Sequence, residues 1–322
     1  MDLIYTNASK VDQGVLSAYA FDLSFGEDEN DFEMTLGADE PVLEYSAFAY
    51  IEGTEYGGII DAMQTSTDGE TITYKGRTWH GMLNSKVIQP DTGEDYLVVN
   101  GDANAVLAVL ISRLGLEDLF VANEASSGIN ISNYQFKRYC KGYDGIRAML
   151  AKSNAKLKVV WKDRCVYLYA EPIVDYTKAP IDGDVAKLKV QQQKNKVNHL
   201  ICLGRGDLAE REVIHLYADD FGQIVDTQYF TGLNEIADVY DFSSVESSEE
   251  LRESGLEEFE KLRDVDTADI SVPENDSLIF DIGDIVGASD AAKTKISVAS
   301  AVTQKIVKIN NGAISTEYKT GS

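Results

Sequence analysis

The sequence Val302-Thr-Gln-Lys-Ile-Val-Lys-Ile309, followed by Asn310-Asn311-Gly312 and then by Ala313 to Thr320, decides the fold class. The segment before the turn is rich in β-branched residues, which fit a pleated strand. Asn-Gly readily takes the positive φ angles of a tight hairpin turn, and a second extended segment follows it. We therefore predict a β-hairpin over residues 302–320 and a chain rich in such strands.

A second segment resembles this hairpin. Asp68-Gly69-Glu-Thr-Ile-Thr-Tyr74-Lys75-Gly76 and Asn311-Gly312-Ala-Ile-Ser-Thr-Glu-Tyr318-Lys319 are each a turn followed by a strand that ends in Tyr-Lys. Each follows a strand interrupted by glycine, at 51–60 and at 282–286. Two explanations are open, an old internal duplication or the chance recurrence of similar hairpins.

The rest of residues 1–95 also indicates β-structure. We predict a long strand over Pro41–Ile51, a strand over Gly57–Met63 and a strand over Thr71–Tyr74. Trp79–Leu83 is compatible with one short helical turn.

The middle of the chain, residues 96–180, predicts a small α+β region. Apolar residues at helical spacing indicate a helix within 101–115, capped by Asp102 and stopped by Gly115; they are Val106, Leu107, Leu110, Ile111 and Leu114. A second helix is predicted over 145–152. Two strands, 157–161 and 165–169, follow it and are joined by the tight turn Lys162-Asp163-Arg164.

Residues 185–230 return to β-structure, and a helix is predicted over Glu249–Arg263. Ser247 and Glu250 form the S-x-x-E capping-box pattern at its start, and Pro273 ends any continuation. Its narrow apolar stripe consists of Leu256, Phe259 and Leu262.

Composition excludes several classes of protein. The chain has 322 residues, enough for two or more domains, and 44% of them are hydrophobic. Its 54 acidic and 29 basic residues give a net charge of −25, which argues against sequence-specific DNA binding. The cysteines, Cys140, Cys165 and Cys202, lack a CxxC spacing, so we expect buried, reduced thiols. Without a signal-peptide pattern at Met1–Thr6 or an apolar run of about 20 residues, we expect folding in a reducing cytoplasm.

The motif most suggestive of chemistry is Gly204-Arg205-Gly206-Asp207-Leu208-Ala209. It fits G-x-G-x-x-A after a predicted strand, and Asp226 stands where a ribose-binding acid belongs. A dinucleotide site needs a helix after the glycines, whereas Arg211–Tyr217 predicts a strand. We therefore interpret the motif as a hairpin turn.

Other candidate residues have simpler interpretations. His80, His199 and His215 lack the spacing of metal ligands or of a triad, so we expect structural roles. Two acidic groups, Glu27 to Glu33 and Asp219-Asp220 before Gly222, are predicted to lie in solvated loops. The near-alternating lysines indicate the solvated face of a strand rather than a nucleic-acid patch; they are Lys187, Lys189, Lys194 and Lys196.

Several strings resemble the hub, or tail-associated, proteins of siphophages and of prophages of Gram-positive bacteria. In chain order they are Gly57–Asp61, Tyr74–Trp79, Asn198–Gly206 running to Val213–Tyr217, Asp281–Gly287 and Val302–Ile306. These proteins are similar to the baseplate hubs of contractile tails. The resemblance implies a trimer with two tube-like β-domains per subunit. Its pseudo-sixfold ring would close the hexameric tail tube and convert six-fold to three-fold symmetry.

The resemblance and the pattern together lead us to expect a β-rich α+β fold. It would hold two tube-like β-barrel domains, a small α+β domain and a helical segment. The expected boundaries are 1–95 for the first tube-like domain, 96–180 for the peripheral α+β domain, 181–235 with 272–322 for the second tube-like domain, and 236–271 for the helical insertion.

The resemblance also implies a structural role in the virion, at the tail tip, after production in the bacterial host cytoplasm. Expected partners are further copies in a homotrimer, the tail tube or distal tail protein, the tape measure protein, and tail fibre or receptor-binding proteins. DNA would pass without specific binding, along a wall that the net charge predicts to be acidic, with Glu27–Glu33 as one candidate. Many members carry a C-terminal lytic or fibre domain, but this sequence ends at Ser322, soon after its last predicted hairpin.

We accordingly predict no enzyme activity and no catalytic, cofactor-binding or metal-binding residues. Two other functions stay open from the sequence. A carbohydrate- or receptor-binding module of the tail suits the aromatic, β-rich composition. A cell-wall hydrolase requires paired carboxylates brought together by folding.

Overall fold

The computed structural model describes residues 1–65, 69–178, 181–182, 186–192, 197–219, 223–262, 266–272, 279–289 and 296–321. They form two compact units, residues 1–190 with 267–322 and residues 191–266. Both units are rich in strands and the described residues include four α-helices, which confirms the predicted β-rich α+β class. Within the described ranges, every helix is too short or too polar to span a lipid bilayer.

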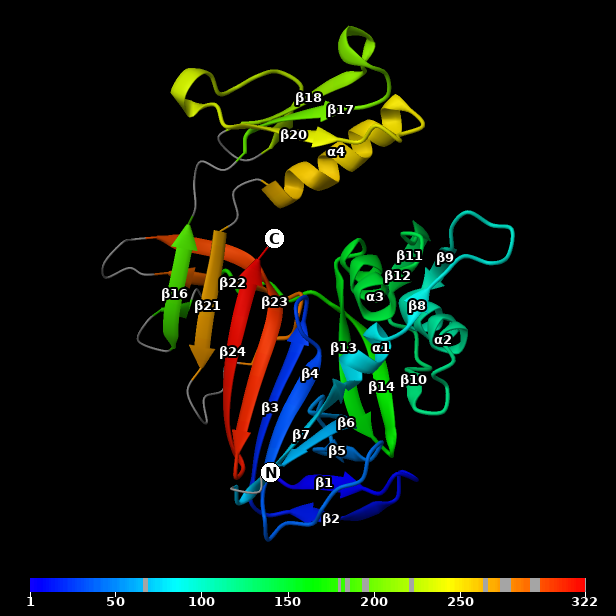
Figure 1. The fold of residues 1–322 in the computed structure, drawn as a ribbon, viewed down its shortest axis with the longest axis vertical. Coiled ribbons are helices and arrows are strands. Elements are labelled where there is room, and N and C mark those ends of the chain that lie inside the picture. Colours follow the sequence, from blue (N-terminus) through cyan, green and yellow to red (C-terminus); the bar gives the residue numbers. More distant parts are fainter. Residues whose placement is uncertain are drawn as a thin grey trace. The chain divides into compact units, whose positions relative to one another are not determined.

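The first unit is built on a 13-stranded sheet (Figure 1). Its path runs β16-β21-β24-β23-β3-β4-β7-β6-β5-β1-β2, with β22 beside β23 and β15 beside β22. The strands are β1 Leu3–Thr6, β2 Asp12–Leu16, β3 Tyr19–Gly26, β4 Asp31–Gly37, β5 Phe48–Tyr50, β6 Gly57–Thr65, β7 Thr71–Thr78, β15 Ile181–Asp182, β16 Lys187–Gln192, β21 Asp266–Val272, β22 Ile285–Ser289, β23 Ser297–Asn310 and β24 Ala313–Gly321. Among these described strands the path does not close, so the two expected β-barrels are not seen as closed barrels.

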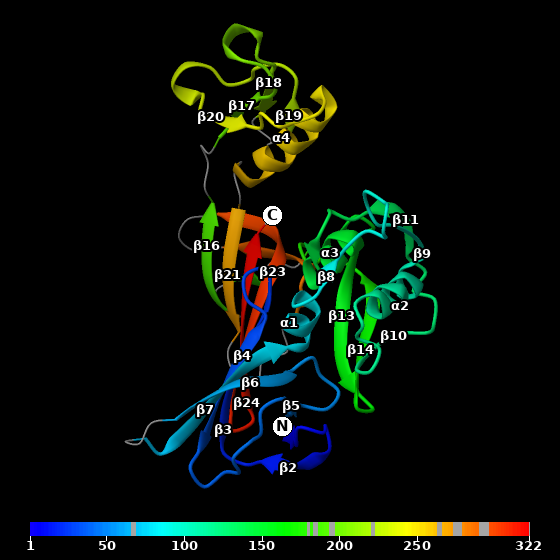
Figure 2. The ribbon, with the colours of Figure 1, turned by 45° about the vertical axis from the view of Figure 1, so that its right-hand side comes forward.

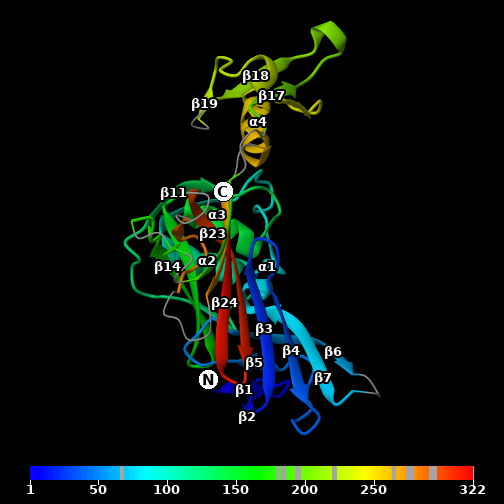
Figure 3. The ribbon, with the colours of Figure 1, turned by 90° about the vertical axis from the view of Figure 1, so that its left-hand side faces the viewer.

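The sheet twists along its path, so that β6 and β7 run inclined to β23 and β24 (Figure 2, Figure 3). Its strands alternate between an apolar and a polar face. On β3, for example, Phe21, Leu23 and Phe25 are buried, whereas Asp22 is exposed. The apolar face packs two clusters of buried side chains, one over β3, β4 and β7 and one over β21 to β24.

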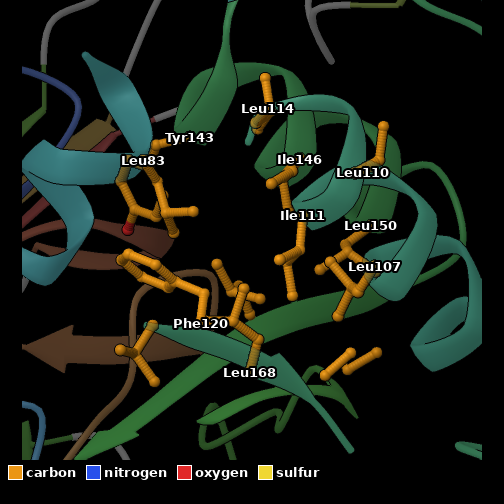
Figure 4. Close-up of a cluster of buried hydrophobic side chains, with 14 of the residues drawn as sticks. Leu83, Leu107, Leu110, Ile111, Leu114, Phe120, Tyr143, Ile146, Leu150 and Leu168 are labelled. Atoms are coloured by element: carbon orange, nitrogen blue, oxygen red, sulfur yellow. The ribbon is translucent and has the colours of Figure 1, made fainter. Parts of the chain in front are cut away.

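An α+β region, residues 79–172, belongs to the same unit. Its helices are α1 Trp79–Asn84, α2 Ala103–Arg113 and α3 Gly142–Ala151, and its strands are β8 Val87–Ile88, β9 Val98–Asp102, β10 Phe120–Ala122, β11 Asn130–Gln135, β12 Cys140–Lys141, β13 Ala155–Lys162 and β14 Cys165–Pro172. Side chains of α2, α3, β10 and β14 meet in one apolar core, among them Leu107, Ile146, Phe120 and Leu168 (Figure 4).

Local chemistry places the ends of these elements as predicted. The Asp102 carboxylate accepts the N–H of Asn104 and caps α2. Gly115 follows the helix with φ +64°, a conformation that favours glycine. The β13–β14 hairpin turns through Asp163 and Arg164, both at positive φ, because Lys162 pairs directly with Cys165.

The second unit is a four-stranded sheet, in the order β19-β18-β17-β20, with one long helix on one face. Its elements are β17 His199–Leu203, β18 Val213–Ala218, β19 Ile224–Val225, β20 Ala237–Asp241, α4 Ser248–Leu262 and the 3-10 turns η1 Leu208–Glu210 and η2 Gly232–Asn234. Leu200, Cys202 and Leu216 of the sheet pack against Leu251 and Phe259 of α4.

The helix α4 begins one residue before the predicted start. Ser247 Oγ accepts the N–H of Glu250 at 3.2 Å, as in a capping box. The Glu250 carboxylate, however, accepts the N–H of Glu246 rather than that of Ser247. The predicted helix end at Arg263 and the stop at Pro273 lie outside the described residues.

The predicted strand Pro41–Ile51 is wrong for most of its length, because only Phe48–Tyr50 forms a strand. Before it, the N–H of Leu43 donates to the hydroxyl of Tyr74, and Ser46 takes φ +63°. These side-chain and turn contacts hold the segment away from a sheet ladder.

The compact units also divide the chain differently from the expected domain boundaries. Residues 197–235 lie with 236–262 in the second unit, whereas the C-terminal strands lie in the first. The reason is a parallel ladder between β17 and β20, in which His199 faces Ala237 and Leu203 faces Asp241. Residues 237–241, expected in a helical insertion, thereby form a strand of the same sheet as β17.

Candidate functional site

The large sheet contains two four-stranded blocks with the same strand order. The first block is β3-β4-β7-β6 and the second block is β16-β21-β24-β23. Each ends in a hairpin, β6–β7 or β23–β24, whose second strand pairs with β4 or β21. The blocks lie side by side because β23 of the second pairs with β3 of the first (Figure 1).

Both hairpins carry a β-bulge at the same place in the ladder. The extra residue is Asp61 in the first block and Thr303 in the second. The rungs around it are Ile60–Gly76, Ala62–Lys75 and Met63–Tyr74 in the first hairpin, and Val302–Thr320, Gln304–Lys319 and Lys305–Tyr318 in the second. The Tyr-Lys pair noted in the sequence therefore occupies equivalent rungs.

The two tyrosines also make the same hydrogen bond. The hydroxyl of Tyr74 accepts the N–H of Leu43 at 3.1 Å, and that of Tyr318 accepts the N–H of Phe280 at 3.2 Å. Leu43 stands five residues before β5, which pairs with β6, and Phe280 stands five residues before β22, which pairs with β23. Strand order, bulge and tyrosine bond coincide, which favours duplication over chance recurrence.

The junction between the blocks shows how one block pairs with the next. The first half of β23 pairs with β22, and its second half, Gln304–Asn310, pairs with β3. The first half of β6 likewise pairs with β5, but its second half, Ala62–Thr65, has no strand on that side among the described residues. At the other end of the sheet β16, the equivalent of β3, is an edge strand.

A buried ionic cluster lies on the apolar face of β23, against α1. Lys305 Nζ is 2.7 Å from Glu55 Oε1, and His80 Nε2 is 3.5 Å from Glu55 Oε2. Burial lowers the pKa of His80 to about 4 even though Glu55 opposes the shift. Burial acts most strongly to raise the pKa of Glu55, but the Lys305 ammonium and His80 together outweigh it and hold this pKa below its usual value. The cluster thus contains one ion pair and a neutral imidazole at neutral pH.

A second ionic contact joins the α+β region to the segment just before β22. Lys156 Nζ of β13 lies 2.9 Å from Asp281 Oδ2 and 2.7 Å from Asp284 Oδ1, and Lys158 Nζ lies 2.8 Å from Asp281 Oδ1. The side chains of Lys156 and Asp284 are buried. The sequence did not predict these contacts or the pairing of Lys305 with Glu55, and its only signal is lysine within otherwise apolar strands.

The Gly204–Ala209 motif is a turn, as predicted. It connects antiparallel β17 and β18 and is followed by a single 3-10 turn, so a helix N-terminus for pyrophosphate is absent from this described segment. Arg205 donates to the carbonyls of Val245 and Glu246, and Asp226 pairs with Arg252 of α4 at 2.8 Å. Arg205 and Asp226 therefore each have a structural contact.

Two of the three histidines meet in the second unit, which the sequence did not predict. His199 Nε2 lies 2.8 Å from His215 Nδ1, and His199 Nδ1 lies 2.7 Å from Glu235 Oε1. The two histidines stand on neighbouring strands, so only pairing of β17 with β18 brings them together. Within the described part of the chain, no three or more His, Cys, Asp or Glu residues are grouped to hold a metal ion.

The remaining candidates are distributed over surfaces. Glu27 lies 3.4 Å from Arg147 and Glu33 lies 2.6 Å from Lys75, and Asp31 and Glu33 stand on β4 rather than in the expected loop. Asp219 accepts the N–H of Gln223 in a turn; Asp220 and Gly222 lie outside the described residues. Lys187 and Lys189 are exposed on the edge strand β16, as predicted, whereas Lys194 and Lys196 lie outside the described residues.

The three cysteines are free thiols. Cys202 is buried, and burial raises its pKa to about 11. Cys140 and Cys165 are half-buried, so the expectation of buried thiols holds only for Cys202.

Comparison with known proteins gives a fold but no family by sequence. No family model and no curated protein matches the sequence. Solved structures do match, along nearly all of this chain. The tail protein from Neisseria meningitidis MC58 is 11% identical, with a TM-score of 0.56 and coverage of 100% of this chain and 96% of that chain.

Two prophage proteins give the same result. The 43 kDa tail protein of prophage MuSo2 from Shewanella oneidensis is 9% identical, with a TM-score of 0.59 and coverage of 99% and 97%. The prophage tail protein gp18 from Listeria monocytogenes EGD-e is 12% identical, with a TM-score of 0.53 and coverage of 100% and 94%. The chain therefore has the fold of phage tail proteins, and the resemblance noted in the sequence is confirmed at the level of fold.

Proposed function

We propose that this chain is a structural hub subunit of a phage tail tip, three copies of which form a ring that closes the tail tube and lets DNA pass. The observation that carries the proposal is the repeated block. The likeness to tail proteins supports the fold, and the repeat supplies a physical reason for a ring with pseudo-sixfold symmetry.

The internal junction serves as a template for contacts between copies. The second half of β23 accepts β3 as its neighbour, and the equivalent half of β6 offers the same edge. β16 holds the place of β3 in its own block, so β16 of a neighbouring copy fits the edge of β6. Such head-to-tail contacts use two different surfaces and generate a ring when the rotation closes. They would also cover the edge strands of the sheet.

The size of such a ring suits a DNA conduit. Each chain contributes the eight strands of its two blocks, so three copies contribute 24. At about 4.8 Å between strands, the perimeter is about 115 Å and the backbone diameter about 37 Å, before strand tilt widens it. That opening leaves room for duplex DNA inside the side chains. Each block with its flanking strands then supplies one of the two tube-like modules expected per subunit, and six modules match a hexameric tube.

The role implies partners and a location. A ring at the tail tip contacts the tail tube or distal tail protein on one side, the tape measure protein in its lumen, and fibre or receptor-binding proteins outside. The chain would act in the virion without catalysing a reaction.

Disulfide cross-linking between copies tests the ring. Ile306 faces Ser24 at the internal junction. Gln64 is the equivalent of Ile306, since it stands two residues after Ala62 as Ile306 does after Gln304. In the second block Lys189 contacts Asp269 at 3.4 Å, and in the first block Asp22 faces Glu33, the equivalent of Asp269. Lys189 is therefore the equivalent of Asp22. Gln191 stands two residues after Lys189, as Ser24 does after Asp22, so Gln191 is the equivalent of Ser24. The double variant Gln64→Cys/Gln191→Cys should therefore form covalent dimers and trimers on mild oxidation.

The matched control is Gln64→Cys/Lys187→Cys, which moves one thiol by four residues, or roughly 13 Å, along β16. It should form few cross-links, as should either single variant. A double variant that stays monomeric on denaturing gels, while circular dichroism shows native structure, would contradict the proposed edge contact.

A further inference from the structure

The two blocks share a continuous polar face, opposite the buried clusters. Residues that face each other across the ladders include Lys308 and Asp22, then Asp22 and Glu33, then Glu33 and Lys75. In the second block Asp269 faces Lys319, and Lys319 faces Gln304. Because side chains alternate between faces along a strand, these rungs define which residues belong to the polar face.

The charges on this polar face cancel. Its basic residues are six: Lys75, Arg77, Lys187, Lys189, Lys308 and Lys319. Its acidic residues are also six: Asp22, Asp31, Glu33, Asp61, Asp269 and Glu317. The net charge of these described residues is zero, whereas the whole chain carries −25. The acidic excess therefore lies elsewhere in the chain.

Several of these charges are paired in direct contact. Lys75 Nζ lies 2.6 Å from Glu33 Oε2, and Lys189 Nζ lies 3.4 Å from Asp269 Oδ2. Arg77 binds Asp61 with two nitrogens, at 2.7 Å and 2.8 Å. Asp61 is the bulge residue of β6, so the bulge directs a carboxylate onto the guanidinium of the neighbouring strand. Gln304 and Ser24, between the blocks, hydrogen-bond to each other at 2.8 Å.

We infer that this charge-compensated polar face is the wall of the DNA conduit, an inference that rests on the proposed ring. The apolar face cannot serve, because it packs the cores of both blocks and the α+β region. The composition led us to expect an acidic wall, and the structure points instead to paired charges.

Charge compensation gives a wall suited to rapid passage. DNA binds proteins mainly by exchanging condensed counterions for Lys and Arg, and this gain scales with the number of phosphates neutralised. On this face three of the six basic groups, Lys75, Arg77 and Lys189, already contact a carboxylate, and the six acidic residues balance the total charge, so binding a phosphate gains little. A strongly acidic wall, by contrast, would repel the phosphates along the whole passage.

The test is to remove the compensation without changing side-chain shape. The variant Asp22→Asn/Glu33→Gln/Asp269→Asn/Glu317→Gln leaves four basic groups per chain without acidic counterparts. The matched control neutralises four exposed acids of the α+β region, by Glu94→Gln/Asp95→Asn/Asp118→Asn/Glu124→Gln. Sedimentation first establishes that each protein is trimeric. Binding is then measured over a salt series, at the salt concentrations where sedimentation shows a trimer, with linear duplex DNA and with a covalently closed circular duplex of the same sequence.

Wild type and control should retain neither DNA. The polar-face variant should bind the linear duplex about tenfold or more tightly than wild type, with steep salt dependence, and should not bind the closed circle, which cannot thread a ring. Equal binding of both forms by a trimeric variant would place the face outside the lumen and overturn the inference. Tight binding of linear DNA by the wild-type trimer would overturn charge compensation. A wild-type chain that stays monomeric would overturn the ring itself and this inference with it.

Discussion

Replacing Lys305 by methionine should test the buried ionic cluster at its centre. The Lys305 side chain is 3% exposed and its partner Glu55 is 15% exposed. Methionine is the residue that the first block carries at the equivalent rung, Met63, so the substitution introduces a side chain that an equivalent strand accommodates. The variant therefore removes the charge while retaining most of the apolar stem.

The expected cost follows from the state of Glu55. Its carboxylate remains buried beside His80 but loses the ammonium 2.7 Å away. Breaking a buried ion pair on one side costs about 3–5 kcal/mol, and the partial exposure of Glu55 places this case at about 3 kcal/mol. The double variant Glu55→Met/Lys305→Met leaves no uncompensated charge in the pair and should recover to within about 1 kcal/mol of wild type.

Urea unfolding of the wild type, both single variants and the double variant measures the coupling. The folded pKa of Glu55 is below its unfolded value, so its contribution is present above the unfolded pKa and is lost as the pH falls through the folded pKa. The deficit of Lys305→Met should accordingly be largest near neutral pH and shrink below about pH 4. A Lys305→Met protein as stable as wild type at pH 7, or a double variant no better than the single, would refute this reasoning.

Three further predictions follow from particular residues. Burial lowers the pKa of His80 to about 4, so as the pH falls from 6.5 to 4 only the unfolded state gains this proton. Over this pH range the free energy of unfolding should therefore fall by about 3 kcal/mol more in wild type than in His80→Gln, as read from urea midpoints. Tyr74→Phe and Tyr318→Phe should each cost about 1–2 kcal/mol, because each leaves a buried N–H without its acceptor; a cost at only one would count against equivalent blocks. The trimer would combine three chains that each carry a net charge of −25, so in sedimentation it should dissociate more readily at low salt than at moderate salt. A sedimentation profile that does not change with salt would argue against repulsion between copies.

Local signals in the sequence predicted the elements that local chemistry controls. The Asn311-Gly312 turn, the Asp102 cap and the Asp163-Arg164 turn depend on side chains within a few residues, and the structure has each of them. The resemblance between the two Tyr-Lys strands was also visible, because equivalent tyrosines keep the same sequence neighbours.

What the sequence did not predict depends on partners far along the chain. Lys305 meets Glu55 across 250 residues, and Lys156 meets Asp284 across 128. No periodicity marks such pairs, since a buried lysine in a strand is indistinguishable from an exposed one until its partner is placed. The placement of β20 beside β17, and the contact between His199 and His215, likewise arise only when strands pair. The segment before β5 failed as a strand because a distant tyrosine holds its backbone.

Imaging of the purified protein by electron microscopy tests the central claim most directly. Particles viewed along their axis should average to a closed ring with three-fold symmetry, six similar modules around it and a central opening. Monomers at every protein concentration and salt, or an open assembly without a central hole, would contradict the proposal that two repeated blocks per chain build a tail-tip ring.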